Sequence, residues 1–293
     1  MANTRKRAKG QQRGRTLDVL AVGEVRATLG DAPLRRDLLI EYLHLIQDRF
    51  GCISDTHCVA LANELAIAST EVFEVATFYH HFDVIKDDDQ RPPAITVRVC
   101  DSMTCAMFGA SDLQASLDAA FGSDVRVQAV PCVGRCAEAP VAVVGHNPVE
   151  QASLECVQTA VNEKALTAPV TDHLNYAAYC AKGGYELLLE CHNQKRTPDD
   201  VIEALKDSNL RGLGGAGFPA GTKWSMLREQ TAPRLLAVNI DEGEPGTFKD
   251  RVYLEQDPHR FIEGMLIAAW AIDAEACYIY IRDEYTACRL ALL

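Results

Sequence analysis

The sequence predicts an α/β protein made of three successive parts, and three changes in residue patterning carry that prediction. Apolar residues between Leu34 and about Phe82 recur at intervals of three and four, which is the period of helices buried on one side. From Ile95 onward apolar and polar residues alternate, which is the period of a strand. From about Thr167, helical stretches and short apolar strands surround a glycine-rich loop. A chain of 293 residues is long enough for two domains or a few small ones.

The first part, residues 17–90, is predicted to be a small helical bundle or packing arm. The residues that set its helical period are Leu38, Leu39, Tyr42, Leu45, Ile46, Phe50, Leu61, Leu65 and Ala68. A break at Gly51 divides the pattern. Helices with a single apolar stripe cannot bury it alone, so we expect them to pack together. The polar, proline-terminated run at residues 87–93 is expected to be a linker.

The second part, residues 91–165, is predicted to be a compact α/β unit. Alternating residues predict strands at Ile95–Cys100, Val125–Ala129 and Val141–Val144, and an amphipathic helix at Leu113–Phe121. The order is therefore strand, helix, strand, strand, with cysteines on the loops between these elements.

The third part, residues 166–293, is predicted to alternate helices and strands. Its expected helices are 198–206 and 261–272, and its expected strands are 235–240 and 277–281. Pro198, Asp199 and Asp200 favour the start of the first helix. The sequence ends inside an apparent helix, Cys288–Leu293, without a capping glycine or a polar tail, so we expect the chain to be C-terminally truncated.

Charge and composition exclude several classes of function. The net charge of −12 argues against a nucleic-acid-binding protein. Residues 1–16 form a basic arm that we expect to be disordered; its charged residues are Arg5, Lys6, Arg7, Lys9, Arg13 and Arg15. No apolar stretch follows this arm, so it is not a secretion signal, and nowhere are there enough consecutive apolar residues for a membrane span. Eleven cysteines without such a signal indicate reduced thiols, metal ligation and a cytoplasmic protein.

Four of the cysteines have the spacing of metal ligands. Cys100 and Cys105 are separated by four residues, and Cys132 and Cys136 by three. A [2Fe–2S] cluster needs four thiolates, two for each iron, and short loops at strand ends can supply them in pairs. Structural zinc accepts similar spacings, so spacing alone leaves iron–sulfur, zinc and unrelated thiols open. The remaining cysteines lack ligand spacing and are expected to be buried free thiols.

The residues around this quartet carry a resemblance to a known family. The runs C-D-S-M-T-C and P-C-V-G-R-C-A-E-A-P resemble the thioredoxin-like ferredoxin domain of the [2Fe–2S] subunit of NADH dehydrogenase. The preceding F-E-V-A-T-F-Y, residues 73–79, resembles the helical arm of that family, and Pro140 stands where its pattern has proline. The resemblance implies a [2Fe–2S] cluster held by Cys100, Cys105, Cys132 and Cys136.

Two loops in the third part have the chemistry of a nucleotide site. Gly212–Gly221, the glycine loop, contains G-x-G-x-x-G, but a helical stretch precedes it and proline follows, so the context of a Rossmann fold is absent. Its glycines still let the backbone approach a flat ring or a pyrophosphate, with Lys223 for phosphate and Phe218 for stacking. Asp241–Gly246, the acidic loop, follows an apolar strand, where α/β proteins bind ligands.

These loops also resemble a family. G-L-G-G-A-G-F-P-A-G-T-K-W and N-I-D-E-G-E-P-G-T-F-K-D-R resemble the FMN- and NADH-binding segment of the flavoprotein subunit of NADH dehydrogenases. The resemblance implies two sets of contacts. Those to FMN are Gly212, Gly214, Lys223, Asn239, Asp241 and Glu242; those to NAD(H) are Gly215, Ala216, Phe218 and Glu244. Leu213 and Met226 depart from the family, which often has arginine at the first position and sometimes an aromatic residue at the second.

The two resemblances together imply a fusion. The expected order is a helical arm, a thioredoxin-like [2Fe–2S] domain and the first part of an FMN/NADH-binding flavoprotein domain. In that family the flavoprotein continues further and carries a [4Fe–4S] site, expected here only in a missing C-terminal part. Fusion of this kind, and C-D-S-M-T-C-A-M, resemble the β subunit of NAD-dependent molybdenum or tungsten formate dehydrogenases.

The implied function is that of a diaphorase, which passes electrons between NAD(H), FMN and iron–sulfur clusters. Its expected partner is a molybdopterin- or tungstopterin-containing formate dehydrogenase α subunit, with no nucleic acid and no membrane insertion. The alternatives are the diaphorase subunit of NAD-reducing [NiFe] hydrogenase with hydrogenase partners, respiratory NADH dehydrogenase, and a non-catalytic [2Fe–2S] electron carrier.

Overall fold

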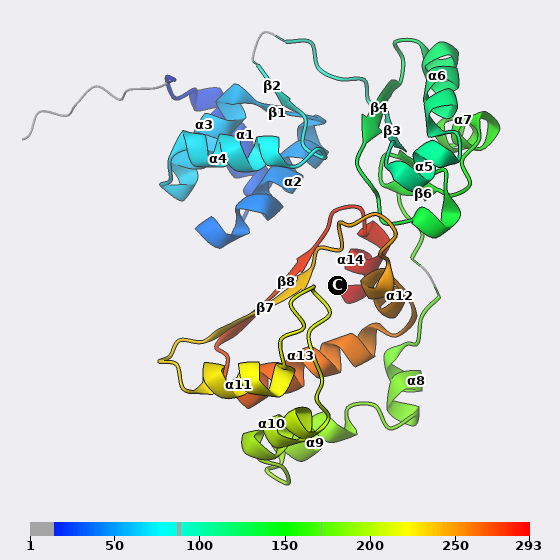
Figure 1. Cartoon of the computed structure of the whole chain (residues 1–293). Helices are drawn as coiled ribbons and strands as arrows, with labels where there is room; N and C mark the ends of the chain where they lie inside the picture. Colours follow the sequence, from blue (N-terminus) through cyan, green and yellow to red (C-terminus); the bar gives the residue numbers. More distant parts are fainter. Residues whose placement is uncertain (1–14, 87–88, 171) are drawn as a thin grey trace, which may run out of the picture. The chain divides into compact units, whose positions relative to one another are not determined.

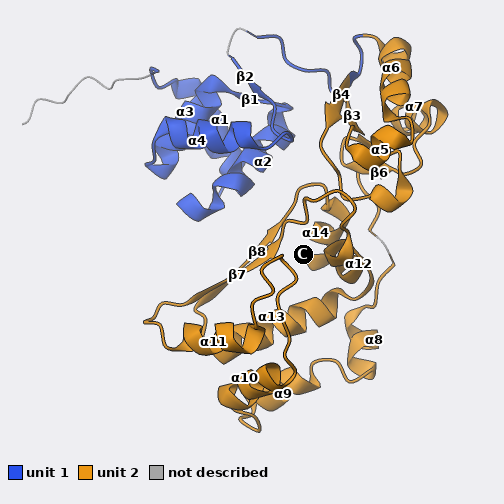
Figure 2. Ribbon diagram, in the orientation of Figure 1, with its two compact units in different colours: residues 1–94, 123–126 blue, residues 95–122, 127–293 orange. Residues whose placement is uncertain are grey.

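The computed structural model describes residues 15–86, 89–170 and 172–293. Most of the basic arm expected at residues 1–16, and two residues of the linker expected at 87–93, lie outside this range. The chain divides into two compact units (Figure 2), each described here by itself. Unit 1 comprises Met1–Ala94 with Ser123–Arg126, and unit 2 comprises Ile95–Gly122 with Val127–Leu293.

Unit 1 is mostly helical, as its apolar spacing predicts. Its elements are α1 (Val19–Leu29), η1 (Arg36–Leu38), α2 (Leu39–Phe50), β1 (Ile53–Ser54), α3 (Asp55–Leu65), α4 (Ser69–Phe78) and β2 (Val84–Ile85). The helices share one core, whose fully buried side chains include Tyr42, Ile46, Leu61 and Val72. The two short strands pair in parallel, with Ile53 opposite Val84.

Local signals set the ends of these helices. Asp18 caps α1 by accepting hydrogen bonds from the backbone N–H groups of Leu20 and Ala21. Gly51 ends α2 in the left-handed conformation (φ 72°), which explains the break in the apolar period at this residue. Ser54 caps α3 through the N–H of His57.

The first part of unit 2 is built around a four-stranded sheet (Figure 1). Its elements are β3 (Thr96–Cys100), α5 (Met103–Met107), α6 (Ala110–Phe121), β4 (Arg126–Val130), η2 (Cys136–Glu138), β5 (Ala142–Val144), β6 (Asn147–Val149) and α7 (Leu154–Asn162). The strand order is β4-β3-β5-β6, and β5 runs antiparallel to both of its neighbours. All five residues of the central strand β3 are buried.

The prediction of strand, helix, strand, strand is confirmed for β3, α6, β4 and β5. The strand β6 was not predicted, because Asn147 and Pro148 are residues that sequence patterns assign to turns. Proline is accepted at a sheet edge, and β6 is an edge strand that pairs only with β5.

The second part of unit 2 combines a two-stranded parallel sheet with helices (Figure 1). Its elements are α8 (Tyr176–Ala181), α9 (Glu186–His192), α10 (Pro198–Asp207), α11 (Ala220–Arg228), β7 (Leu235–Ile240), α12 (Lys249–Gln256), α13 (Pro258–Ile272), β8 (Ala276–Ile281) and α14 (Thr286–Leu292). The strands β7 and β8 are in register, with Ile240 opposite Ile281. The C-terminal end of this sheet packs against α12 and α14, through a small core of Ile240, Leu254, Tyr285 and Cys288.

The predicted elements of this part are confirmed as α10, β7, α13, β8 and α14. The first of them begins with a capping box between Thr197 and Asp200. The helix α13 begins three residues earlier than predicted, because Asp257 caps it and Pro258 occupies its first turn. Short helices such as α8, α9 and α12 were not predicted, since few turns give too little apolar period to read.

None of the helices in the described residues is long and apolar enough to cross a membrane.

Candidate functional site

The structure brings the four spaced cysteines together from four different elements. Cys100 ends β3, Cys105 lies in α5, Cys132 follows β4, and Cys136 begins η2. Cys100, Cys105 and Cys132 are at most 3% exposed, and Cys136 is half-buried. The sulfur atoms of Cys132 and Cys136 lie 3.4 Å apart, and Cys100 is within hydrogen-bonding reach of both Cys132 and Cys105. Four thiols separated by up to 36 positions in the sequence therefore form one cluster.

Backbone N–H groups point at these sulfurs. The N–H of Gly134 donates to Cys132 Sγ at 3.4 Å, and the N–H groups of Ser102 and Val133 donate to the Cys100 sulfur. The N–H of Gly246, in the acidic loop, donates to Cys136 Sγ at 3.1 Å. Such donors stabilise thiolate ligands and the negative charge of a metal cluster. An all-thiol donor set surrounded by N–H groups fits an iron–sulfur cluster.

The thiols also influence one another's ionisation. The hydrogen bond between Cys100 and Cys132 lowers the pKa of Cys100 and raises the pKa of Cys132, because the first thiolate formed accepts the proton of the second thiol. Burial raises the pKa of Cys136. The cluster of thiols is therefore arranged to lose its first proton readily and to resist losing further protons without a compensating cation.

Residues 132–136, here called the cysteine loop, are held by side chains from the second part of unit 2. Arg282 donates to the carbonyl oxygen of Cys132, and Arg251 Nε donates to that of Gly134 at 3.3 Å. The loop also packs directly on Tyr285, which is fully buried. Arg135 pairs with Glu150 at 2.5 Å and with Glu255 of α12 at 3.2 Å. The cysteine loop and the residues after β7 and β8 therefore form one buried polar junction.

Glu242 occupies the centre of this junction. Its carboxylate is only 2% exposed and accepts from the N–H groups of Asp250 and Arg251, at the start of α12, and from the hydroxyl of Tyr285 at 2.9 Å. Burial opposes its ionisation, but these donors and the charge of Lys249 hold the pKa of the carboxyl below its usual range. Of the residues expected to contact FMN, Glu242 is the one whose carboxylate faces the protein interior.

The glycine loop is exposed and open. An N–H···O bond from Gly212 to Phe218 closes it, and Arg211 Nη1 donates to the carbonyl of Gly217 at 3.1 Å. Gly215 and Gly217 have positive φ values of 95° and 61°, and a methyl group added at either would meet no atom within 4 Å. The backbone is therefore accessible to a ligand.

Several predicted contact residues line this exposed region. Leu213, Gly214, Ala216 and Phe218 are exposed, with Phe218 47% exposed. Lys223 lies in α11, and within the described part of the chain its ammonium group makes no hydrogen bond or ion pair. Gly221, in contrast, is buried against Lys206 of α10, so it serves packing between helices.

The acidic loop presents the remaining predicted contacts to solvent. Asn239, Asp241 and Glu244 are exposed, and Asn239 Oδ1 accepts from the N–H of Asp241 at 2.9 Å. An open glycine backbone, an unpaired cation and exposed carboxylates match the phosphate and hydroxyl groups of a flavin nucleotide. The residues present therefore fit FMN. The described residues show no hydrogen bond that joins the glycine loop directly to the acidic loop.

Three residues of the junction were missed by the analysis of the sequence: Gly246, Arg282 and Tyr285. One signal could have found Arg282. In a parallel pair the carboxyl ends of both strands lie at one edge, so the polar residues after β8 belong beside the acidic loop after β7. Of the cysteines outside the quartet, Cys156 and Cys277 are exposed, so the expectation that all would be buried is wrong for these two.

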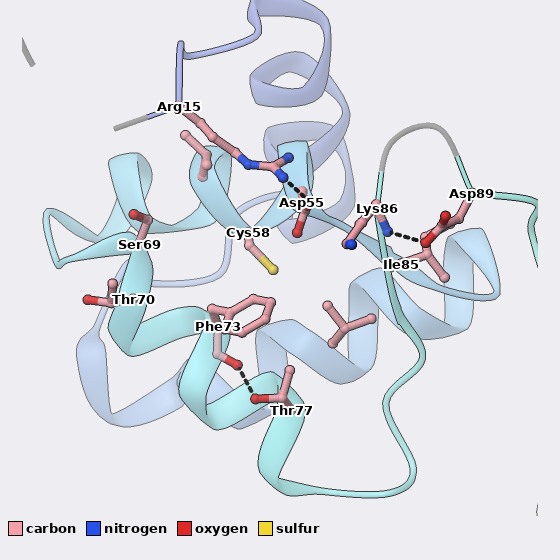
Figure 3. A pocket seen from close by; sticks show the side chains of 12 residues that line it. Arg15, Asp55, Cys58, Ser69, Thr70, Phe73, Thr77, Ile85, Lys86 and Asp89 are labelled. Carbon is pink, nitrogen blue, oxygen red and sulfur yellow. Dashed lines mark hydrogen bonds and ion pairs between the residues drawn. The ribbon is translucent and has the colours of Figure 1, made fainter. Parts of the chain in front are cut away.

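Unit 1 contains a cavity of about 480 Å³ between α3, α4 and β2 (Figure 3). Its wall is formed by apolar groups such as Phe73 and Ile85, with Arg15 paired to Asp55 at one side. No residue predicted to bind a cofactor lines this cavity.

Comparisons with known proteins agree with this geometry. Residues 25–165 match the thioredoxin-like [2Fe-2S] ferredoxin family, and residues 205–292 match the Nuo51 FMN-binding domain. A protein of the NADH-quinone oxidoreductase of Rhizobium meliloti is 53% identical over 110 residues, which is 37% of this chain and 26% of that protein. Its counterpart in Aquifex aeolicus is 49% identical over 109 residues, or 37% of this chain and 25% of that protein. The chain therefore spans about a quarter of the length of these relatives.

A solved structure resembles both parts of the chain. An NAD+-reducing [NiFe]-hydrogenase in the air-oxidized state superimposes with a TM-score of 0.72 and 27% sequence identity, over 87% of this chain and 47% of that chain. The predicted fold class is confirmed, and zinc is no longer needed to explain the quartet. The chain carries a thioredoxin-like [2Fe–2S] ferredoxin domain followed by an Nuo51-type FMN-binding domain.

Proposed function

We propose that this chain is a diaphorase module that passes electrons between NAD(H), FMN and a [2Fe–2S] cluster. The observation that carries the proposal is the hydrogen bond from Gly246 to Cys136. It joins the loop expected to hold the nucleotides to a residue expected to hold the cluster, so the two redox sites are direct neighbours in the fold. When bound, FMN supplies the exchange between the two-electron chemistry of NAD(H) and the one-electron chemistry of iron–sulfur clusters.

The residues of the chain would bind and orient these groups. Cys100, Cys105, Cys132 and Cys136 would each give one thiolate to the cluster. Lys223 would neutralise the FMN phosphate, while the backbone of Gly212 and Gly214 allows close approach of the flavin. Asn239 and Asp241 would accept hydrogen bonds from its hydroxyl groups. Glu242 would act from inside, because its carboxylate fixes the acidic loop to the start of α12.

The NAD(H) contacts are proposed for Gly215, Ala216, Phe218 and Glu244. Gly215 and Ala216 lie in the exposed, open part of the glycine loop, where a dinucleotide can pass over the backbone. Phe218 offers an exposed ring face for stacking, and Glu244 an exposed carboxylate for ribose or carboxamide groups.

For the electron donor we propose formate, oxidised on a molybdopterin- or tungstopterin-containing partner subunit, as the C-D-S-M-T-C-A-M motif suggests. The similarity to a NAD+-reducing [NiFe]-hydrogenase over 87% of the chain favours a second candidate, a hydrogenase partner. Similarity to NADH-quinone oxidoreductases supports NADH dehydrogenase as a third. Isolation of the complex and measurement of its bound molybdenum, tungsten and nickel distinguishes these partners.

The cofactors are tested by chemical analysis of the purified chain. We expect two iron and two sulfide per chain, and loss of both in Cys132→Ser. The matched control is Cys156→Ser, because Cys156 is exposed on α7 and lies outside the quartet. One zinc per chain in place of iron would contradict the assignment.

The flavin site is tested through Lys223. We expect Lys223→Gln to weaken FMN binding by tenfold or more, since a hydrogen bond to a charged group contributes about 1.5–3 kcal/mol. The control is Lys195→Gln, another exposed lysine of unit 2. Turnover is tested by NADH-dependent reduction of a dye. A chain replete in iron and flavin that shows no turnover would indicate the non-catalytic electron carrier instead.

A further inference from the structure

Arg282 joins the two loops that the proposed function assigns to different cofactors. It directly follows β8, and its side chain is only 6% exposed. Nη2 donates to the carbonyl oxygen of Cys132, and Nη1 donates to the carbonyl oxygen of Glu242 at 2.5 Å. The first acceptor belongs to an expected cluster ligand and the second to the acidic loop. One guanidinium therefore ties the cysteine loop to the acidic loop.

The geometry requires arginine. Nε and Nη2 of Arg282 also bind the carboxylate of Glu284, at 3.0 and 2.9 Å, so the guanidinium uses donors on all three of its nitrogens. Burial would lower the pKa of Arg282, but the hydrogen bond to Glu284 and its charge outweigh this effect and keep the group cationic. A planar fork with several fixed donors is specific to arginine, whereas lysine offers a single nitrogen.

A cation in this position acts on the charge of the cluster. Reduction of an iron–sulfur cluster adds one negative charge, and a positive charge in contact with a ligand residue stabilises that charge. The effect is large where water is excluded, because the effective dielectric constant is low. Hydrogen bonds, burial and nearby charge are among the factors that set the potential of such clusters.

We propose that Arg282 is a positioning residue that clamps the cysteine loop onto the acidic loop and raises the reduction potential of the [2Fe–2S] cluster. The inference rests on the proposed function, because it needs a cluster in the quartet. It assigns to a residue of the FMN-binding domain control over a centre whose ligands all lie in the ferredoxin domain.

The test is a redox titration of the whole chain, followed by the EPR signal of the reduced [2Fe–2S] centre. In Arg282→Gln we expect the ratio of reduced to oxidised cluster at a fixed potential to fall at least tenfold, which is 59 mV for a one-electron couple. Arg282→Lys keeps the charge but loses the fork, so its midpoint should lie between those of Arg282→Gln and the unaltered chain.

Arg234 provides a matched control within unit 2. It precedes β7 and also combines carbonyl and carboxylate contacts, since it donates to Ile272 at 2.6 Å, to Gln230 at 2.9 Å and to Asp273. It lies at the opposite end of the sheet from Arg282, about 20 Å away along six residues of strand. Arg234→Gln should lower stability through similar losses but leave the midpoint of the cluster unchanged.

Each result decides the proposal. A cluster-loaded Arg282→Gln chain whose midpoint equals that of the unaltered chain would overturn it. If Arg282→Gln fails to hold a cluster, Glu284→Gln decides, since removal of this counter-charge should raise the midpoint, and an unchanged midpoint would overturn the proposal. Zinc or no metal in the unaltered chain would overturn the proposed function and this inference together, and metal analysis recognises that case separately.

Discussion

Substitution of Gly134 by alanine tests the packing of the cysteine loop on the second part of unit 2. Gly134 has a φ of 73°, and a Cβ built there would lie 2.5 Å from Cε1 of Tyr285 and 2.7 Å from its hydroxyl oxygen. Tyr285 is fully buried and its hydroxyl is bound to Glu242 at 2.9 Å, so the ring cannot move aside without breaking that bond. We therefore expect Gly134→Ala to destabilise unit 2.

The expected magnitude has two sources. A left-handed conformation costs a residue other than glycine about 1–2 kcal/mol. Insertion of a methyl group into a packed interior costs about 1–3 kcal/mol. Together these predict a loss of about 2–5 kcal/mol in the free energy of unfolding of unit 2. The measurement is urea unfolding followed by tryptophan fluorescence, because both tryptophans, Trp224 and Trp270, belong to unit 2.

Two other glycines of unit 2 separate the two sources. Gly109 has a φ of 88° but open space around it, so Gly109→Ala should show only the conformational cost of about 1–2 kcal/mol. Gly264 lies in the middle of α13, also with open space, and Gly264→Ala should stabilise unit 2 by about 0.5–1 kcal/mol. If Gly134→Ala costs no more than Gly109→Ala, the contact between the cysteine loop and Tyr285 is refuted. In a Tyr285→Phe background the cost should be smaller, since the ring is no longer anchored.

Three further predictions concern the same unit. Glu242→Gln should lower the urea midpoint at neutral pH; because the pKa of Glu242 is lowered in the folded state, its contribution is present above the unfolded pKa and lost as pH falls through the folded value, so the two proteins should converge in acid and a constant difference would contradict this. Thr197→Ala removes the cap of α10 and should cost about 1 kcal/mol in urea unfolding, with Thr197→Ser close to the unaltered chain. Gly221→Ala would place a Cβ 2.7 Å from the backbone nitrogen of Lys206 and should cost about 1–3 kcal/mol, whereas loss of FMN binding without loss of stability would show that Gly221 belongs to the nucleotide site.

The sequence by itself determined the local features of this protein. The cysteine spacings, the glycines between them and the change from helical to alternating period are short-range patterns, and the structure has β3, β4 and β5 where these patterns predict strands. Pro198 with Asp200 located the start of α10, because caps and first-turn residues act within a few positions. The glycine loop was correctly separated from a Rossmann fold, since its strand context is missing.

Only the tertiary structure decided how the two cofactor regions meet. Gly246 contacts Cys136 across 110 positions, and Arg282 contacts Cys132 across 150. No local pattern encodes such pairs, because they depend on how the parallel pair β7–β8 brings the ends of two strands to one edge. The same packing turned the carboxylate of Glu242 inward, although the loop sequence gives it the same character as its exposed neighbours Asp241 and Glu244. Burial is a property of the assembled fold, and it separates residues of one chemical type into those that hold the loop and those that face a ligand.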